Sequence, residues 1–578
     1  MEANIGPQAM TRWDQQVDLL VFGSGAAGMT AALVGAHEGL DVVLCEKSPL
    51  VGGTTATSGG SLWIPGAGPI VRNGKAESVE EVRRYLRGEL DEHVRWDLMD
   101  AFLAAGPAAI DYLEQRTDVR FEHLQNPDYH SDSPGGSAFG RAITAAPFDG
   151  RLLGPDFELL RPPRSVFLIF GGMMVYRREI QTLLRPFASL SALKHAIKVL
   201  ALHAWSRLRY PRGTRLLIGN ALIGRYLLSL RKKGVPIWVN ANLVELVREG
   251  AQVSGAVVEV NGVRRAVRAR RGTVLATGGI PHNKALRAEL MKRFPHSHSL
   301  VFEGNTGDGL VRSRAVGAVV DDGVSNPGFW SPASILKRPD GGETVWVHGH
   351  MDRGKPGLIA VNSEGRRFVN EADSYHDFVM AMFRSTQDVP AIPAYLICDH
   401  RFIRRYGLGL VRPLYPRLAP YVAAGYLKTA QSVADLARQL GIDPANLAET
   451  IAEHNRDADS GVDRAFGRGS TAFNRFNGDP ENKPNPCMKP IENPPYYAMA
   501  VHPCTIGTTI GIKTDKDARA LDSNANPIRG LYACGNDASS VMRGFYPGPG
   551  ITLGPAVVFA YRAVMHMVSK TPAGSSIH

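Results

Sequence analysis

The chain has 578 residues, of which 44% are apolar and 21% charged, with a formal net charge of +11 at pH 7. Hydrophobic cores stop growing at roughly 250 to 300 residues, so we expect at least two domains. The near-average composition excludes a largely disordered chain. Because no run of eighteen apolar residues occurs, we expect no transmembrane helix.

The cysteines are odd in number, scattered, and form no C-x-x-C pair: Cys45, Cys398, Cys487, Cys504 and Cys534. This pattern argues against a disulfide framework and against a metal site. The first twenty residues lack a basic start followed by an apolar stretch, so we expect no secretory signal. A cytoplasmic protein fits these features best. No nucleic-acid recognition motif accompanies the positive charge, so we expect no nucleic-acid partner.

A dinucleotide-binding motif is indicated near the start of the chain. Residues 17–22 have the pattern of a buried strand, and a small-residue helix is expected over 29–38. The turn between them is Gly23, Ser24, Gly25, Ala26, Ala27 and Gly28. In such a turn the glycines permit a tight bend, close approach of a pyrophosphate and packing of helix on strand. A Rossmann-type α/β fold is therefore predicted.

A second strand, residues 41–45, ends at Glu46, where a carboxylate can accept hydrogen bonds from ribose hydroxyls. The glycine- and hydroxyl-rich segment after it can lie along an extended dinucleotide. Its candidate cofactor-binding residues are Lys47, Gly53, Thr54, Thr55, Ser58, Gly59 and Gly60. Later Gly-rich turns add Ala276, Thr277 and Gly278 after a strand at 273–279, then Asp308, Gly535 and Asn536.

These motifs, in this order from residue 17 to near residue 562, resemble the FAD-binding domain of the fumarate reductase and succinate dehydrogenase flavoprotein superfamily. The resemblance implies FAD as cofactor, with Gly550, Thr552 and Leu553 also near it. Membrane-bound members carry their flavin on a histidine in the loop after the ribose acid. This chain has Thr54, Thr55 and Thr57 there and no histidine, so non-covalent FAD is expected.

Two further segments indicate the substrate. Soluble fumarate reductases have an arginine four residues after a segment resembling Gly365–Glu371, where this chain has Tyr375. A phenol cannot clamp a dicarboxylate as a guanidinium can. Near the C-terminus, residues 546–555 (YPGPGITLGP) are similar to the 3-ketosteroid Δ1-dehydrogenases. That resemblance implies that Tyr546 and the amide of Gly550 hold the ketone oxygen as an oxyanion hole.

The same resemblance makes Tyr375 the base for the C2 proton and Tyr129 its assistant. The family usually has two adjacent tyrosines where this chain has Tyr129 and His130. We therefore expect FAD-dependent 1,2-dehydrogenation of a 3-ketosteroid, in steroid degradation, with a quinone or dye as external electron acceptor. A phenol with an ordinary pKa near 10 requires a lowered pKa or an alkaline optimum. Dehydrogenation at C4 and C5, an enoate reductase of the fumarate type and a non-catalytic flavoprotein are the alternatives.

In the expected plan, residues 1–320 and 505–578 form a discontinuous FAD-binding domain, interrupted by an α+β substrate (cap) domain at 321–504. Within the cap domain, 428–456 is expected to be helical and 459–494 an extended surface loop.

Residues 183–215 form a basic amphipathic insertion. In and just before it, the only acid is Glu179, and there are nine basic residues: Arg177, Arg178, Arg185, Lys194, Lys198, Arg207, Arg209, Arg212 and Arg215. Between Leu190 and Leu208, apolar residues recur at spacings of three and four, as on one helix face. The helix either packs this face on the protein's own core or lies on an anionic membrane, which would place the protein peripherally on the inner face of the cell membrane.

One prediction follows from the loop at residues 51–60, which offers no histidine for covalent attachment. The purified protein should be yellow, and acid precipitation should release all of its flavin as FAD into the supernatant, measured by absorbance and chromatography. Flavin that stays with the precipitated polypeptide would contradict the expectation.

Overall fold

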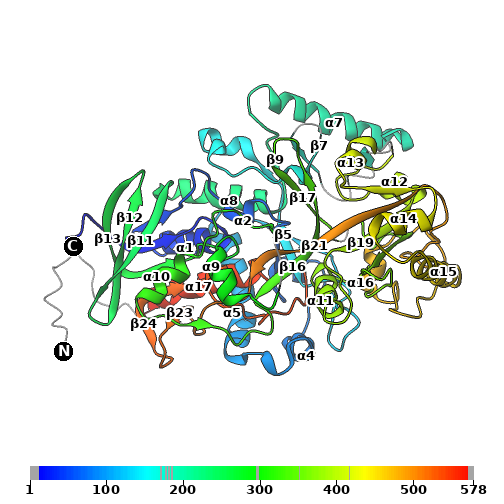
Figure 1. Cartoon of the computed structure of the whole chain (residues 1–578). Coiled ribbons are helices and arrows are strands. Elements are labelled where there is room, and N and C mark those ends of the chain that lie inside the picture. The colour runs from blue at the N-terminus through cyan, green and yellow to red at the C-terminus, as the bar shows by residue number, and fades with distance from the viewer. Residues whose placement is uncertain are drawn as a thin grey trace.

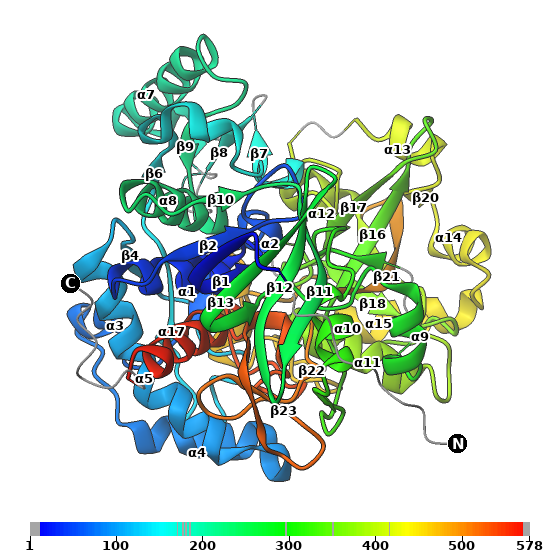
Figure 2. The same cartoon turned by 90° about the vertical axis from the view of Figure 1, so that its left-hand side faces the viewer.

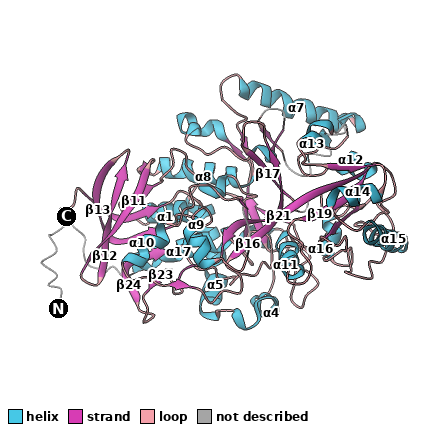
Figure 3. Ribbon diagram, in the orientation of Figure 1, coloured by secondary structure: helices cyan, strands magenta, loops and turns pink. Residues whose placement is uncertain are grey.

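The computed structural model describes residues 12–169, 172–175, 179, 182–183, 186–294, 298–349, 352–414 and 417–569. Two large sheets organise the chain, one at one end of the molecule and the other extending from its middle toward the opposite end, with helices around both (Figures 1 and 3). None of the described helices is long and apolar enough to cross a membrane.

The first sheet carries the predicted dinucleotide motif. Its strand order is β10 (Ile237–Trp238), β2 (Val42–Cys45), β1 (Gln15–Phe22), β13 (Val263–Leu275), β12 (Gln252–Val260), β24 (Pro527–Ala533) and β23 (Arg519–Leu521), with β11 (Ala241–Glu249) paired to β12. β1 runs parallel to β2 and to β13. The strands expected at 17–22, 41–45 and 273–279 are thus β1, β2 and the end of β13, and the Rossmann-type α/β prediction is confirmed.

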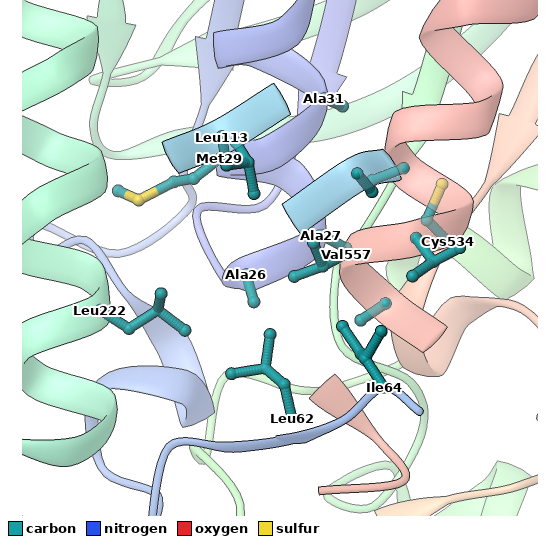
Figure 4. Close-up of a cluster of buried hydrophobic side chains, with 14 of the residues drawn as sticks. Ala26, Ala27, Met29, Ala31, Leu62, Ile64, Leu113, Leu222, Cys534 and Val557 are labelled. Carbon is teal, nitrogen blue, oxygen red and sulfur yellow. The ribbon is translucent and has the colours of Figure 1, made fainter. Parts of the chain in front are cut away.

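Helix α1 (Ala26–His37) packs between α8 (Ile218–Lys232) and α17 (Leu553–Ser569), as the close-up in Figure 4 shows. Its small side chains, such as Ala26 and Ala27, let the neighbouring helices approach closely. A Cβ on Gly28 would lie 1.8 Å from the carbonyl oxygen of Gly23. Only glycine therefore fits where this helix leaves the first strand.

The second sheet has the order β17 (Glu343–Val347), β16 (Gly328–Lys337), β21 (Tyr496–Thr508), β19 (Ala394–Asp399) and β18 (Leu358–Val361), with β14 (His298–Ser299) and β20 (Lys428–Ala430) paired to β21. Helix α11 (Tyr375–Ser385) packs on β16. The expected domain boundaries at 320/321 and 504/505 fall inside β15 (Val320–Asp321) and β21. Strand β21 thus continues from the proposed cap domain to the FAD-binding part.

The remaining elements are α2 (Gly53–Ala56), β3 (Ser61–Trp63), α3 (Gly68–Arg72), α4 (Val79–Leu90), α5 (Trp96–Arg116), β4 (Phe121–Leu124), β5 (Ala142–Ala145), β6 (Phe148–Asp149), β7 (Leu168–Ile169), β8 (Met173–Met174), α7 (Leu190–Arg207), β9 (Arg215–Leu216), α9 (Lys284–Leu290), α10 (Asp308–Ala315), α12 (His400–Tyr406), α13 (Ala419–Ala423), α14 (Val433–Leu440), α15 (Pro444–Ser460), α16 (Ala472–Asn477) and β22 (Gly511–Ile512), besides short 3-10 turns.

Of two expectations for the cap region, the first is largely confirmed and the second is wrong. Residues 428–456 are mostly helical, but they form two helices after strand β20, because Gly441 ends α14 in a left-handed conformation and Pro444 begins α15. The stretch 459–494 is not a surface loop, since Arg468 and Asn474 are buried within it. Its polar side chains bond to main-chain and side-chain groups of the protein, so their burial is compensated.

Helix α7 begins where expected and stands at the edge of the molecule in both views (Figures 1 and 2). Only Ala196 and Val199 of this helix are buried. The predicted apolar face points outward instead: Leu190 is 77% exposed, Ile197 58% and Leu208 79%. That face therefore does not pack on the protein's own core. The basic residues Arg177, Arg178 and Arg185 lie outside the described residues.

Candidate functional site

A cavity of about 670 Å³ lies between the two sheets' ends and is lined by segments from the whole length of the chain. It brings together all of the expected site residues except Gly28, which packs helix on strand. From the motifs it contains Gly23, Ser24, Gly25, Ala26, Ala27, Glu46, Lys47, Gly53, Thr54, Thr55, Ser58, Gly59, Gly60, Ala276, Thr277, Gly278, Asp308, Gly535, Asn536, Gly550, Thr552 and Leu553, and the tyrosines are Tyr129, Tyr375 and Tyr546.

At one end of the cavity, Glu46 is fixed by its neighbours. One carboxylate oxygen accepts hydrogen bonds from the amide and hydroxyl of Ser24, at 3.0 and 2.5 Å, and the other accepts from the amide of Ser48 at 2.9 Å. The oxygen that accepts only from Ser48 keeps a second lone pair for a further donor. Lys47 Nζ pairs with Asp308 Oδ2 at 2.6 Å. The carboxylate expected to hold a ribose is thus held in place beside the cavity.

The glycine-rich wall fits an extended dinucleotide. A Cβ built on Gly53 or Gly59 would meet no atom of the protein within 4 Å, so the space beside both backbones belongs to the cavity. Thr55 Oγ1 accepts from the amide of Ala26 at the start of α1 and holds this loop against the helix. Backbone that is open on one side and anchored on the other is what close approach of a pyrophosphate requires.

Asp537 supports this wall and was missed by the sequence analysis. Its carboxylate accepts hydrogen bonds from the amide of Thr277 at 2.5 Å, the hydroxyl of Thr277 at 2.9 Å and the amide of Gly279 at 3.1 Å. Two glycine-rich turns from distant parts of the chain are thereby joined. The acidic residue directly after Asn536 was the available signal.

At the other end of the cavity, three tyrosines form one hydrogen-bonded chain. Tyr129 Oη donates to Tyr375 Oη at 2.8 Å, and Tyr375 Oη donates to Tyr546 Oη, also at 2.8 Å. The rings of Tyr129 and Tyr546 stack with centroids 5.4 Å apart, and that of Tyr375 meets both edge-on. Residues separated by more than 400 positions thus form a single cluster of phenols.

Burial raises the pKa of all three phenols well above the ordinary 10.0. For Tyr375, the neighbouring Tyr129 and Asp377 act in the same direction. The lowering of the Tyr375 pKa that a phenolate base would need at neutral pH is therefore not supplied by these surroundings. Of the two sequence-based options, the structure favours the alkaline optimum.

Gly550 lines the cavity in the turn that carries Tyr546. Its φ is +96°, and a Cβ there would lie 2.4 Å from the carbonyl carbon of Ser61. Its carbonyl oxygen accepts from the amide of Trp63 at 3.0 Å, which attaches the turn to β3. Only glycine can occupy this position, and its main chain therefore forms the cavity wall directly.

His130, the departure from the family pattern, bridges two carboxylates beside the tyrosines. Its Nδ1 lies 2.5 Å from Glu89 Oε2 on α4, and its Nε2 lies 3.1 Å from Asp377 Oδ2 in the first turn of α11. Burial alone would lower the pKa of His130, but hydrogen bonds to Asp377 and Glu89 raise it to about 11. The imidazolium thus ties the segment carrying Tyr129 to the helix carrying Tyr375.

The cavity wall also holds residues that no sequence motif indicated. They are mostly apolar or isolated in sequence and include Asn126, Arg164, Val166, Phe167, Ile169, Met174, Val175, Leu300, Phe302, Ser331, Trp346, Val347, Arg412, Phe473, Phe476, Asn477 and Ile506. The apolar members make much of the cavity wall apolar, and the ring of Phe473 packs against that of Tyr129. Such a wall suits a flat apolar molecule with a polar end.

The His130 bridge predicts a pH dependence of stability. Because its folded pKa exceeds the ordinary 6.5, the bridge contributes fully below about pH 6.5 and is lost as the pH rises through about 11. The thermal unfolding midpoint of the holoprotein should therefore fall less between pH 7 and 9.5 in His130→Gln than in the parent. Glu89→Gln, which keeps the imidazole but removes one carboxylate, should be intermediate. Identical slopes in all three proteins would rule out a charged bridge.

Comparison with known proteins agrees with this geometry. The model of the FAD binding domain family matches residues 18–553. A 4-oxocyclohex-2-ene-1-carboxylate 5-dehydrogenase of Sinomonas cyclohexanicum is 38% identical, over 94% of this chain and 92% of that protein. A 3-oxosteroid 1-dehydrogenase of Mycobacterium tuberculosis is 34% identical, over 96% of this chain and 99% of that protein.

Among solved structures, the 3-ketosteroid Δ1-dehydrogenase of Sterolibacterium denitrificans, in complex with 1,4-androstadiene-3,17-dione, superposes with a TM-score of 0.89. It is 34% identical, and the match covers 96% of this chain and all (100%) of that one. The chain is an FAD-dependent oxidoreductase that belongs to the FAD binding domain family, in the branch that contains the 3-oxosteroid 1-dehydrogenases.

Proposed function

We propose that this enzyme introduces a 1,2 double bond into 3-ketosteroids. The observation that carries the proposal is the chain of three phenols, Tyr129, Tyr375 and Tyr546, in a largely apolar cavity that the glycine-rich loops also line. The similar 3-oxosteroid 1-dehydrogenases support the substrate class. The reaction would require an external electron acceptor such as a quinone.

The ketone would be held at Tyr546 and Gly550. Since the phenol chain donates from Tyr129 to Tyr375 and on to Tyr546, the hydroxyl proton of Tyr546 is directed to a further acceptor. A substrate carbonyl oxygen that accepts from this hydroxyl and from the amide of Gly550 gains charge as an enolate forms. The neighbouring C–H bond thereby becomes more acidic.

Tyr375 would take the proton from C2 as its own hydroxyl proton passes to Tyr546, while the hydrogen bond that Tyr129 donates to Tyr375 stabilises negative charge developing on the Tyr375 oxygen. FAD, when bound, supplies the acceptor for the hydride that leaves C1. The hydroxyl oxygens of Tyr375 and Tyr546 lie 2.8 Å apart. One can therefore contact the carbonyl oxygen of the substrate while the other contacts the adjacent alpha carbon, as the reaction requires. His130 and Asp377 fix the start of the helix that presents Tyr375.

A second candidate is dehydrogenation of a small ring ketone that carries a carboxylate. The 4-oxocyclohex-2-ene-1-carboxylate 5-dehydrogenase shares 38% identity with this chain. The phenol chain would serve either ketone, because it contacts only the carbonyl and its alpha carbon. The large apolar wall, with Phe167, Phe473 and Phe476, favours the steroid. An enoate reductase is disfavoured, since a phenol stands where fumarate reductases have their arginine.

Product identification and two variants test this proposal together. The parent should convert 4-androstene-3,17-dione to the 1,4-diene, identified by mass and ultraviolet spectrum, with a rate that rises toward alkaline pH. Tyr375→Phe should lower kcat by roughly 10²- to 10³-fold and suppress exchange of the C2 proton while KM changes little. Tyr546→Phe should lower kcat by about 10²- to 10³-fold and also raise KM.

Leu152→Phe, at an exposed position outside the cavity, is the matched control and should behave as the parent. A 4-ene product from 5α-androstane-3,17-dione, without any 1-ene, would place the reaction at C4 and C5 instead. Near-normal turnover by both tyrosine variants would overturn the mechanism.

We also propose that α7 rests on an anionic membrane surface and delivers steroid to the cavity. Its outward apolar residues include Trp205, 63% exposed, and Phe187 precedes it with 86% exposure. Residues 186–212 contain no Asp or Glu, and Lys194, Lys198 and Arg207 are exposed among the apolar residues. An apolar face with basic neighbours matches anionic lipid, each basic residue adding about 1 kcal/mol.

The cavity lies within reach of this surface. Strands β7 and β8 contribute Ile169 and Met174 to the cavity wall, and Phe167 directly before β7 also lines it. The turn between these two strands bonds to the segment after α7, where the amide of Gly213 donates to the carbonyl of Gly172. A water-insoluble substrate leaving the lipid would therefore meet apolar side chains before it reaches the tyrosines.

Flotation with vesicles tests this surface. The holoprotein should float with phosphatidylglycerol vesicles at low salt, float less at high salt, and not float with neutral phosphatidylcholine. The double variant Leu190→Asp, Trp205→Asp should lose at least tenfold in bound fraction. Val263→Asp, on an exposed apolar position of β13, is the matched control and should still float. Failure of the parent to float with anionic vesicles would refute a lipid contact.

A further inference from the structure

The cavity wall carries a group of cationic and hydrogen-bond-donating side chains that the proposed reaction does not use. They gather around Val345 and Trp346 on the edge strand β17. Arg164 donates to the carbonyl oxygens of Leu300 at 3.1 Å and Val345 at 3.2 Å. The guanidinium of Arg412 lies over the ring of Trp346, 5.7 Å from its centroid. Arg164, Trp346 and Arg412 all line the cavity.

The positive charge of this group is not balanced by the part of the cavity wall that the structure describes. The acids there are Glu46 and Asp308; the first is engaged by serine residues and the second by Lys47. Arg164 bonds to main-chain oxygens, and burial lowers the pKa of its guanidinium. A cation removed from water without a counter-ion is unfavourable, and an anionic group beside it removes that cost.

Trp346 adds an independent observation. Its indole Nε1 is buried and has no hydrogen-bond partner among the described residues. A buried donor of this kind costs free energy unless an acceptor reaches it. A negatively charged acceptor would therefore compensate the guanidinium groups of Arg164 and Arg412 and the unpaired indole N–H of Trp346.

We propose that Arg164, Trp346 and Arg412 form an anion-binding subsite that holds a carboxylate carried by the ketone substrate at the end remote from its carbonyl. A carboxylate has two acceptor oxygens, which suit the forked N–H donors of a guanidinium group. The subsite deepens the proposed function and rests on it. The preferred substrate is then a ring ketone with an acidic side chain rather than a neutral dione.

The mechanism gives this subsite a clear role. The phenols contact only the carbonyl and its neighbouring carbon, so they cannot fix the orientation of a long flat ring system. An ion pair at the opposite end fixes that orientation and brings the alpha carbon to Tyr375. Arg412 is exposed at the rim, whereas Arg164 is half-buried, so the carboxylate is met first by one arginine and then held by the other.

A matched pair of substrates tests the subsite: 3-oxo-4-androstene-17β-carboxylic acid and its methyl ester, assayed without vesicles. The parent should prefer the acid in kcat/KM by roughly tenfold, as expected for a charge-assisted hydrogen bond. Arg164→Gln, Arg412→Gln and Trp346→Phe should each lose most of that preference, measured within each variant as the ratio of kcat/KM for the acid to kcat/KM for the ester. Arg338→Gln, on the exposed hairpin between β16 and β17, should keep the preference.

The outcomes separate the two proposals. Turnover of both compounds with no preference for the acid, or a preference that survives the three variants, would overturn the subsite and leave the dehydrogenase assignment intact. Turnover of neither steroid, with arginine-dependent turnover of 4-oxocyclohexanecarboxylate, would overturn the steroid assignment and support the subsite. Loss of bound FAD in Arg164→Gln, measured as flavin per chain, would assign that arginine to the cofactor and overturn its place in the subsite.

Discussion

The carbonyl oxygen of Pro547 joins three segments that the chain keeps far apart. It accepts a hydrogen bond from the amide of Tyr129 at 2.9 Å and from the hydroxyl of Tyr85 at 2.6 Å. Proline has fixed φ, so this acceptor is presented from a stiff turn between Tyr546 and Gly550. These main-chain contacts hold the segment with Tyr129 next to the turn with Tyr546, and so fix the distance between the two phenols.

Buried charge supports the same junction. Asp128, the residue before Tyr129, accepts from the indole of Trp63 at 2.9 Å and pairs with Arg141 at 2.6 Å; Arg141 also pairs with Glu77. Burial raises the pKa of Asp128 to about 6, against the lowering effect of Arg141. A satisfied buried network of this kind fixes one arrangement of its members. The loop that carries Tyr129 is therefore held from behind as well as through Pro547.

The sequence was informative where function constrains the backbone locally. Gly23, Gly28 and Gly550 occupy positions where a Cβ would strike main-chain atoms, and such constraints leave motifs that can be recognised without a structure. The phenol cluster was anticipated only through resemblance, because nothing in the separate stretches around Tyr129, Tyr375 and Tyr546 shows that they meet. Contacts of long sequence separation have no local signature.

Periodicity failed for a related reason. It placed the apolar residues of α7 on one face, but it could not show whether that face meets protein or solvent, and Leu190 and Leu208 are exposed. The polar composition of 459–494 suggested solvent, yet Asn474 and Arg468 are buried because other parts of the chain satisfy them. In the same way, no sequence motif surrounds Arg164 or Arg412, and only the structure shows that both line the same cavity.

In the phenol cluster, proton removal from carbon depends on the contact with the substrate carbonyl rather than on a tyrosine that is already ionised. Burial raises the pKa of Tyr375, and its phenol neighbours would be like-charged if ionised, so a lasting negative charge there is expensive. The proton must therefore leave carbon as the carbonyl oxygen gains charge at Tyr546 and Gly550. Tyr375 receives that proton as its own hydroxyl proton passes along the hydrogen bond to Tyr546, whose proton in turn passes to the carbonyl oxygen, so that no lasting charge remains on a phenol. Proton removal by Tyr375 therefore depends on the exact position of the substrate carbonyl at Tyr546 and Gly550. A contact that orients the far end of the substrate fixes that position and so contributes to catalysis.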